Sequence, residues 1–283
     1  MLRQITIAVI AVALLALAGC GSDGESTLRV SGSTTVNPVA TDAAAALKGT
    51  LKVSVDTQGG SAGGIAQLAA GQVDIAMSSK EVGADDRKRF SAVDFDATQI
   101  GADAVGIVVR REVVDGGLES VTRAQLRRLF EGRVQNWKQL GGPDLEVFVY
   151  DKEPGRGTRE VLDRFLYDED AKAPPPPDSP RYAIVGGNEE TRSKLISTKG
   201  SVGPLSSAFV TGVEELVLLA VDGVAPTPES IEDDSYPLAR PLFLITDGPP
   251  ADASQRFINY VLSTPGQKLV TKHGYVTIDE LDG

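Results

Sequence analysis

The sequence predicts an α/β protein with two lobes. Short strand-like runs alternate along the chain with amphipathic helical segments, and that alternation is typical of α/β architecture. Removing a leader of residues 1–19 leaves 264 of the 283 residues, a length that favours two lobes over one. The single cysteine excludes an internal disulfide, so we expect the fold to be held by its apolar core.

The first twenty residues have the pattern of an export signal. Arg3 precedes an apolar run of about 13 residues, which is shorter than the roughly 20 residues of a membrane-spanning helix. We therefore expect residues 1–19 to be a signal peptide and residues 20–27 to be a flexible tether. Leu17-Ala-Gly-Cys20 resembles the lipobox of bacterial lipoproteins, which implies a lipid on Cys20. The alternative is an ordinary signal with a chance cysteine at this place.

The first third of the chain predicts three strands and two helices. Apolar runs predict strands at 28–30, 51–55 and 73–77. Apolar residues at helical spacing predict one helix near Pro38 and another that the glycine-rich segment 59–64 opens. Polar or glycine-rich residues follow each of these strands, so we expect each strand to end in a polar turn.

The rest of the chain continues the alternation. Apolar runs predict strands at 104–109, 145–150 and 241–246. Thr122 begins a capping-box pattern, which predicts the start of a helix. The other predicted elements are helices after Arg159, around 254–262 and at 265–272, a cap at Gly274, and a stiff proline loop at 174–177.

Three polar, glycine-rich turns each lie between a predicted strand and a predicted helix, at 31–35, 60–64 and 152–158. A fourth polar segment, 78–80, follows a strand. Helix N-termini offer unpaired N–H groups and a positive dipole end, and serine or threonine adds a hydroxyl donor. Any one turn could be an ordinary cap. Because ligands of open α/β sheets collect beyond the carboxyl ends of strands, the four together predict an anion site.

The charge of the chain excludes some classes of partner. The formal net charge is -11, and loss of Arg3 with residues 1–19 changes it to about -12. A strongly acidic chain argues against nucleic-acid binding and against adhesion to anionic lipid through a basic patch. It does not argue against an anionic ligand, because a site can be locally positive.

Catalytic residues are scarce in the sequence. The only histidine, His273, is expected to help cap the end of a helix, and no His/Asp/Glu cluster has metal-ligand spacing. Ser61 lies in Gly-Gly-Ser-Ala-Gly, which is not the Gly-x-Ser-x-Gly motif of hydrolases. We expect no enzyme, metal or cofactor. An extracytoplasmic hydrolase remains one alternative, since the sequence does not fix the distance between His273 and Ser61.

A surface interaction protein that lost its ligand is a second alternative. Aromatic residues make up only 5% of the chain, which disfavours a large aromatic contact surface. Trp137 is expected to pack in the core.

Several motifs resemble the phosphate-binding proteins of bacterial phosphate ABC importers, the PstS family. They are Ser31-Gly-Ser-Thr-Thr-Val-Asn-Pro38, Gly60-Ser-Ala-Gly-Gly64, Asp74-Ile-Ala-Met-Ser-Ser79 and Gly155-Arg-Gly-Thr-Arg159, followed in order by Tyr236-Pro-Leu-Ala-Arg-Pro241 and Gly274-Tyr275. The resemblance spans nearly all of the chain after the leader. It implies a class II periplasmic-binding-protein fold, with each lobe a sheet flanked by helices and a ligand cleft between the lobes.

The resemblance also implies function, partners and site residues. We expect an extracytoplasmic, lipid-anchored monomer that captures inorganic phosphate and delivers it to the membrane subunits of an ABC importer. Lobe I is expected at 28–104 plus about 238–283, and lobe II at about 105–237. The implied anion-binding residues are Ser33, Thr34, Thr35, Ser61 and Ser79 from lobe I, and Lys152, Arg156, Gly157 and Thr158 from lobe II.

Two departures from the family pattern leave the anion open. The family usually has arginine in place of Lys152 and serine in place of Arg156; arginine can bind two oxygens of an oxyanion, whereas lysine is a point charge. Arg156 is expected to point into the cleft, with an outward direction as the alternative.

A further gap concerns the proton of phosphate. Some members of the family have an aspartate near the position of Ser79 that can accept this proton, and that aspartate is absent here. Asp74, Glu81 and Glu153 are candidate substitutes, although a solvated or structural role is the simpler expectation for each. Another oxyanion or a phosphorylated small molecule therefore remains an alternative ligand.

Overall fold

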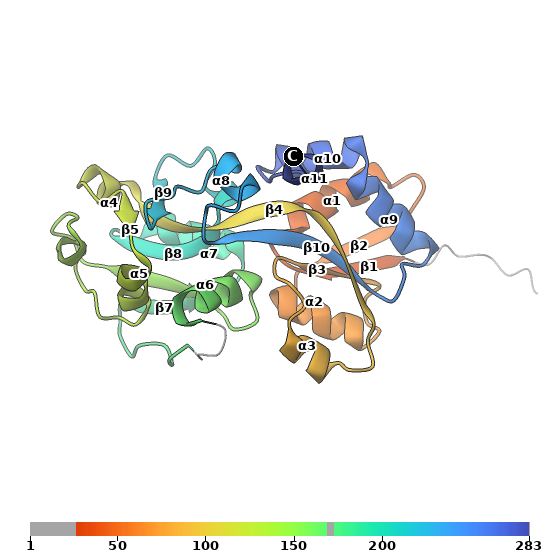
Figure 1. The fold of residues 1–283 in the computed structure, drawn as a ribbon, viewed down its shortest axis with the longest axis horizontal. Helices are drawn as coiled ribbons and strands as arrows, with labels where there is room; N and C mark the ends of the chain where they lie inside the picture. Colours follow the sequence, from red (N-terminus) through yellow and green to blue (C-terminus); the bar gives the residue numbers. More distant parts are fainter. Residues whose placement is uncertain (1–26, 169–172, 283) are drawn as a thin grey trace, which may run out of the picture.

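Two lobes joined by a pair of long strands make up the molecule (Figure 1). The structure is a computed structural model that describes residues 27–168 and 173–282. The predicted signal peptide, Cys20 and all but the last residue of the predicted tether lie outside the described residues. The prediction of a two-lobed α/β fold is confirmed. Within 27–168 and 173–282, no helix has the length and apolar character needed to cross a membrane.

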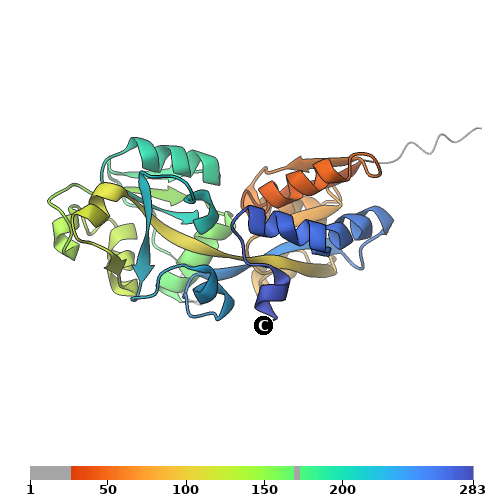
Figure 2. The ribbon, with the colours of Figure 1, turned by 90° about the horizontal axis from the view of Figure 1, so that it is seen from above.

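Lobe I contains a mixed sheet built from both ends of the described chain. β1 (Leu28–Gly32) lies between β2 (Val53–Asp56) and β3 (Ile75–Ser78) and is parallel to both. β10 (Ala239–Asp247) runs antiparallel beside β3. The helices of this lobe are α1 (Asn37–Ala46), α2 (Gly60–Ala69), α3 (Ala84–Arg89), α9 (Asp252–Leu262) and α10 (Thr264–Lys272). Figure 2 shows α1 beside α9 and α10, so residues far apart in the sequence share one core.

Lobe II contains the second sheet. β6 (Phe148–Lys152) lies between β7 (Tyr182–Val185) and β8 (Ser201–Ser206) and is parallel to both. Its longer helices are α5 (Arg123–Phe130), α6 (Gly157–Tyr167) and α7 (Asn188–Ser197). The shorter elements of lobe II are α4 (Arg111–Asp115), β5 (Ser120–Val121), a 3-10 helix at Trp137–Leu140, another at Ser207–Phe209, β9 (Leu216–Val221) and α8 (Pro228–Glu232). The last helix of the described chain is α11 (Ile278–Leu281).

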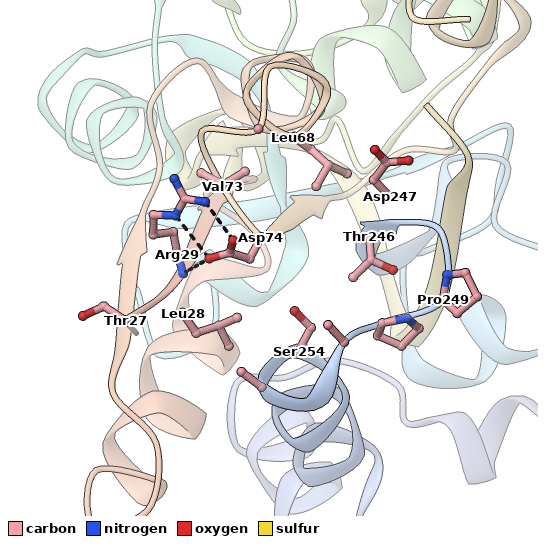
Figure 3. Close-up of a pocket in the computed structure, with 14 residues that line it drawn as sticks. Thr27, Leu28, Arg29, Leu68, Val73, Asp74, Thr246, Asp247, Pro249 and Ser254 are labelled. Carbon is pink, nitrogen blue, oxygen red and sulfur yellow. Dashed lines mark hydrogen bonds and ion pairs between the residues drawn. The ribbon is translucent and has the colours of Figure 1, made fainter. Parts of the chain in front are cut away.

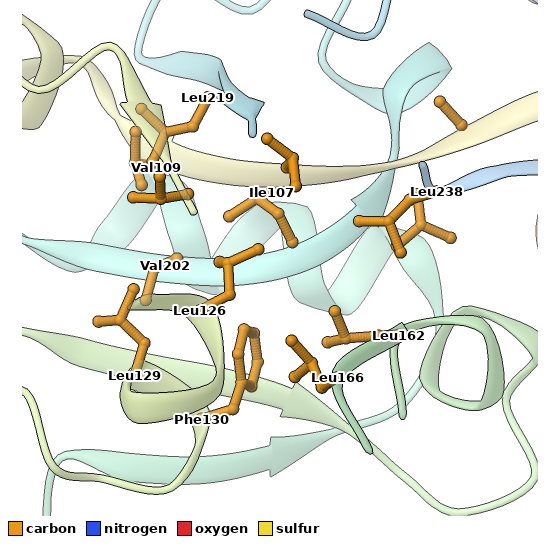
Figure 4. Packing of buried hydrophobic residues seen from close by; sticks show 14 of the residues in the cluster. Ile107, Val109, Leu126, Leu129, Phe130, Leu162, Leu166, Val202, Leu219 and Leu238 are labelled. Carbon is orange, nitrogen blue, oxygen red and sulfur yellow. The ribbon is translucent and has the colours of Figure 1, made fainter. Parts of the chain in front are cut away.

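Leucines of two helices close the core of lobe II over its sheet (Figure 4). Leu126 and Leu129 of α5 and Leu162 of α6 are at most 1% exposed and pack toward Ile107. Burying a leucine side chain contributes about 1.5–3 kcal/mol, so this face of α6 is held firmly against the sheet. The first turn of α6 is thereby fixed in place, and that turn faces lobe I.

β4 (Phe95–Arg110) belongs to both sheets. It pairs with β10 up to Ala104 and with β8 from Val105 onward. The sequence predicted only its second part as a strand, because Asp96, Thr98 and Gln99 interrupt the apolar run. These polar side chains lie at the exposed start of β4, where pairing with β10 alone keeps the backbone extended.

Local signals in the sequence have mixed outcomes. The capping box is confirmed, because Gln125 N donates to Thr122 Oγ1 at 3.2 Å and Thr122 N donates to Gln125 Oε1 at 2.7 Å. Trp137 is fully buried, as predicted, and its Nε1 donates to Gly200 O at 2.9 Å. The expectation for the His273 side chain is wrong. Packing of α10 on α1 brings Asp42 within reach, and His273 Nε2 lies 3.0 Å from Asp42 Oδ2 instead of at the helix carbonyls.

Candidate functional site

A small polar pocket lies between the lobes, and all nine predicted anion-binding residues line it. They are Ser33, Thr34, Thr35, Ser61, Ser79, Lys152, Arg156, Gly157 and Thr158. Gly60, Gly186 and Asn188 complete the lining. None of these lining residues is an aspartate or a glutamate. The ionisable side chains of the lining, Lys152 and Arg156, are both basic.

Strand ends place the lobe I residues. Because β1 and β3 are parallel neighbours, the residues that follow them meet, and Ser33 Oγ donates to Ser79 Oγ at 3.0 Å. Gly32 ends β1 with a φ of +137°, and a Cβ there would lie 2.3 Å from Met77 O. Only glycine can therefore bring the 33–35 turn this close to β3.

The glycine-rich segment 60–64 is the first turn of α2 itself. The segment 59–64 opens a helix as predicted, but the expectation of a turn at 60–64 between strand and helix is wrong, because α2 begins at Gly60. The reason is close packing: a Cβ on Gly64 would lie 2.6 Å from Ser31 O, so glycine lets this turn of the helix lie against β1. Ser61 thereby enters the pocket, where its Oγ accepts from Ser79 N at 3.1 Å.

Arg240, which the sequence pattern did not single out as a site residue, lies behind the pocket hydroxyls. It is 2% exposed. Its Nη1 donates to Thr158 Oγ1 at 2.9 Å and to Ser79 Oγ at 3.3 Å, and its Nη2 donates to Thr35 Oγ1 at 3.0 Å. A guanidinium only donates, so each of these hydroxyl oxygens accepts and keeps its own proton to donate elsewhere. The sequence signal that could have identified Arg240 was the family motif 236–241, which contains it.

Asp103 holds Arg240 in this position. Arg240 Nη2 lies 2.6 Å and Nε lies 3.0 Å from Asp103 Oδ2. The other carboxylate oxygen accepts from Ser206 Oγ at 2.9 Å and from Ser207 Oγ at 3.2 Å. The carboxylate is fully buried and surrounded by donors, so it acts on the pocket through Arg240.

Lys152 is buried at the end of β6. Its Nζ donates to Thr191 Oγ1 at 2.5 Å, to Asn188 Oδ1 at 3.2 Å and to the carbonyl oxygens of Gly187 and Gly186 at 3.3 and 3.4 Å. Burial, followed by the charges of Arg240 and Arg156, lowers the pKa of this ammonium to about 7. The hydrogen bonds of Lys152 Nζ hold the start of α7 in place.

Asn188 is a second lining residue that the sequence did not single out. Its Oδ1 accepts from Lys152, so its Nδ2 faces lobe I and donates to Thr35 Oγ1 at 3.0 Å. No short motif marked Asn188. Its contact spans 153 positions of the sequence and depends on the relative placement of the two lobes.

Arg156 lies at the rim of the pocket. Its side chain lines the pocket, but its Nε and Nη2 donate to Glu153 Oε2 at 3.1 and 2.7 Å. The guanidinium therefore has an acidic partner at the rim. This arrangement lies between the two predicted directions, which were into the cleft and outward from it. Its backbone caps the start of α6.

The three acidic candidates for a phosphate-proton acceptor are absent from the lining. Glu153 binds Arg156, and Glu81 lines a different cavity beside Phe165. Asp74 lies in a larger cavity at the other end of β1, where Arg29 Nη2 donates to Asp74 Oδ1 at 2.8 Å (Figure 3). The simpler expectation of structural roles thus agrees with the contacts of Asp74 and Glu153.

Direct contacts join the lobes around the pocket. Ala62 N of α2 donates to Gly155 O of lobe II at 3.1 Å. Lys80 Nζ, which is held by Asp86, lies 2.8 Å from Glu160 Oε2 on α6. Together with the bond from Asn188 to Thr35, these contacts surround the pocket with protein.

Comparisons with known proteins agree with this architecture. Residues 20–265 match the family model described as PBP superfamily domain. The phosphate-binding protein PstS of Bacillus subtilis (strain 168) is 25% identical over 299 residues, which cover 99% of this chain and 95% of the relative. The phosphate-binding protein PstS of Borreliella burgdorferi is 26% identical over 285 residues, which cover 98% of this chain and 99% of the relative.

Solved structures show the same fold. A putative phosphate ABC transporter substrate-binding protein with bound phosphate from Clostridium perfringens superposes with a TM-score of 0.78 at 24% identity, and the match covers 89% of this chain and 100% of that one. An ABC-type phosphate transport receptor from Vibrio cholerae superposes with a TM-score of 0.69 at 25% identity, covering 88% of this chain and 99% of that one.

Proposed function

Because the chain belongs to the PBP superfamily, we propose that it is the substrate-binding component of a phosphate ABC importer. It captures inorganic phosphate between its two lobes and delivers it to the membrane subunits of the importer. The similarity to the phosphate-binding proteins of Bacillus subtilis and Borreliella burgdorferi over nearly the whole chain supports this assignment.

The observation that carries the proposal is the pocket between the lobes. Hydrogen-bond donors of both lobes converge on it, and its described lining contains no carboxylate. Gly157 and Thr158 begin α6, a helix of 11 residues, so their N–H groups and the helix dipole favour an anion there. Lys152 and Arg156 add positive charge, and Arg240 adds more from behind the pocket.

Each lobe supplies its own set of pocket residues. Lobe I provides the residues Ser33, Thr34, Thr35, Ser61 and Ser79, and lobe II provides Lys152, Arg156, Gly157 and Thr158. An anion that touches both sets stabilises the closed arrangement by the contacts that only this arrangement allows. Release to the importer then requires the lobes to separate.

The crossover strands define the lobes in this proposal. Lobe I comprises 28–104 plus about 238–283, and lobe II comprises about 105–237. The change of partner on β4, from β10 at Ala104 to β8 at Val105, supports this division.

A lipid on Cys20 would keep a monomeric receptor near its importer on the outer side of the membrane. The segment Leu17-Ala-Gly-Cys20 supports this part of the proposal. Metabolic labelling with a palmitate analogue should mark the full chain and should fail on Cys20→Ser. Equal labelling of both proteins would contradict the anchor.

The rival assignment to an extracytoplasmic hydrolase finds no support at the site. His273 lies against Asp42 on α1, and no histidine is among the residues that line the pocket. A binding protein should release no product from phosphate esters under conditions in which it binds phosphate.

Equilibrium dialysis with radiolabelled phosphate tests the proposed ligand. The full chain should bind phosphate, arsenate should displace it, and sulfate should displace it less effectively. If sulfate displaces the radiolabelled phosphate at concentrations equal to or below those of unlabelled phosphate, the natural ligand is instead another oxyanion or a phosphorylated small molecule.

A further inference from the structure

Phosphate and sulfate have the same tetrahedral shape, and hydrogen phosphate carries one proton that sulfate lacks. A protein distinguishes the two anions through an acceptor for that proton. The pocket between the lobes has no carboxylate in its described lining, so neutral oxygens are the candidate acceptors for that proton. The side-chain oxygens of the lining can be assigned from their hydrogen bonds.

Three lining hydroxyls are polarised as donors by cationic or amide N–H groups. Thr35 Oγ1 accepts from Asn188 Nδ2 and from Arg240 Nη2, at 3.0 Å each. Ser79 Oγ and Thr158 Oγ1 both accept from Arg240 Nη1. A hydroxyl whose oxygen accepts from a guanidinium has its proton free to donate, so these three groups suit the unprotonated oxygens of an anion.

Two more hydroxyls are already engaged with lobe I. Ser33 Oγ accepts from the backbone N–H groups of Thr35 and Val36 at 3.2 and 3.4 Å and donates to Ser79 Oγ. Ser61 Oγ accepts from Ser79 N. The Asn188 oxygen is occupied by the Lys152 ammonium.

Thr34 differs from all of these. In the part of the chain that the structure describes, no group forms a hydrogen bond with Thr34 Oγ1, although the hydroxyls on either side of it are bonded. Thr34 is one of the lining residues, and its side chain lies beside Gly187 of lobe II, where an added Cβ would lie 3.1 Å from Thr34 Cγ2 and 3.9 Å from Thr34 Oγ1. Both lone pairs of this oxygen are therefore free of protein donors among the described residues.

We propose that Thr34 Oγ1 accepts the proton of hydrogen phosphate and thereby sets the preference of this site for phosphate over sulfate. The inference rests on the proposed function and adds the residue that determines selectivity. A neutral hydroxyl can also rotate and donate to sulfate, so the site should bind phosphate more tightly than sulfate without excluding sulfate. A carboxylate in the same place would repel the fully ionised sulfate.

Removal of the hydroxyl affects the two anions unequally. In Thr34→Val the proton of bound phosphate has no acceptor and stays buried, which costs about 1–3 kcal/mol. A sulfate oxygen that loses one donor still has the polarised hydroxyls and the α6 N–H groups. The ratio of phosphate to sulfate affinity should therefore fall about tenfold, which corresponds to about 1.4 kcal/mol.

Titration calorimetry of the full chain, with phosphate and with sulfate, tests this inference. Thr34→Val should lower the affinity ratio, and Thr34→Ser, which restores the hydroxyl, should restore the ratio. Thr158→Val is the matched control, because it removes a polarised donor and should weaken both anions by similar factors.

The outcomes separate this inference from the proposed function. If the unmodified chain prefers phosphate and Thr34→Val weakens both anions equally, Thr34 is not the acceptor while the function stands. A lower ratio in Thr158→Val than in Thr34→Val would also overturn the inference. If the unmodified chain binds no phosphate, the proposed function fails and the inference fails with it.

Discussion

Arg240 Nη1 lies 2.9 Å from Thr158 Oγ1, so a side chain of the crossover strand β10 is bonded directly to the first turn of α6 in lobe II. The same guanidinium bonds to Thr35 and Ser79 of lobe I and forms an ion pair with Asp103 on β4. The strands that connect the lobes thus also hold the hydroxyl donors of both lobes in their orientation.

Arg240→Met should lower both stability and anion affinity. The substitution leaves the Asp103 carboxylate buried without its charged partner, so the free energy of unfolding should fall by about 3–5 kcal/mol. Urea denaturation measures this loss. The double variant Arg240→Met with Asp103→Leu removes both charges and should recover much of the stability while phosphate binding stays weak. Affinity equal to that of the unmodified chain in the double variant would contradict the role of Arg240 at the site.

Phosphate binding at pH 8 should take up protons through Lys152. Burial lowers the pKa of its ammonium to about 7, so the group is mostly neutral at pH 8 without an anion. A bound anion favours the charged form and raises this pKa. Calorimetry in buffers of different ionisation enthalpy measures the uptake, which Lys152→Met should abolish. Identical heats in all buffers would show that Lys152 does not titrate with binding.

The same pKa predicts how stability depends on pH without phosphate. The folded pKa of Lys152 is lowered from the ordinary value of 10.5, so the unfolded chain binds more protons than the folded chain between about pH 7 and that value. The contribution of Lys152 to stability therefore rises with pH through this window. Lys152→Met should flatten this part of a stability profile obtained by urea denaturation. An unchanged slope would contradict the assignment.

The ion pair between Lys80 and Glu160 should slow ligand release. It joins lobe I to α6 at 2.8 Å, and Glu160→Gln removes its charge attraction without changing the shape of the side chain. A partly exposed pair is worth about 0.2–1 kcal/mol, so release measured by stopped flow should accelerate by at most about fivefold. Asp144→Asn breaks an exposed pair with Lys138 inside lobe II and should leave the release rate unchanged. Equal release rates in both variants would show that the Lys80–Glu160 ion pair does not help to hold the lobes closed.

Thr122→Ala should lower stability without affecting the site. The threonine caps α5, where its Oγ1 accepts from Gln125 N, and loss of such a cap costs about 1 kcal/mol. Thermal unfolding should register this loss while the phosphate affinity stays constant. A large change in affinity would mean that α5 is coupled to the cleft.

Local chemistry explains which features could be predicted from the sequence. The capping box depends on residues three positions apart, and the hydroxyl turns depend on the strand end directly before them. Both were therefore visible without tertiary information. The predicted lining residues lie together in one pocket, and their role in binding remains a prediction for the experiments above.

Other features depend on contacts between distant segments. Arg240 reaches Thr35 across 205 positions and Asn188 reaches Thr35 across 153, so no local pattern predicted either contact, although the motif 236–241 contains Arg240. The strand predicted at 145–150 occupies Phe148–Lys152, because pairing with β7 and β8 sets its limits. His273 follows the same principle, since packing of α10 on α1 decides its partner.

A crystal structure of the full chain grown with inorganic phosphate would test the central claim most directly. We expect one tetrahedral anion between the lobes, in contact with the Thr34 hydroxyl and with the N–H groups at the start of α6. Phosphate bound elsewhere, for example in the cavity beside Asp74 and Asp247, with the pocket between the lobes unchanged, would contradict it.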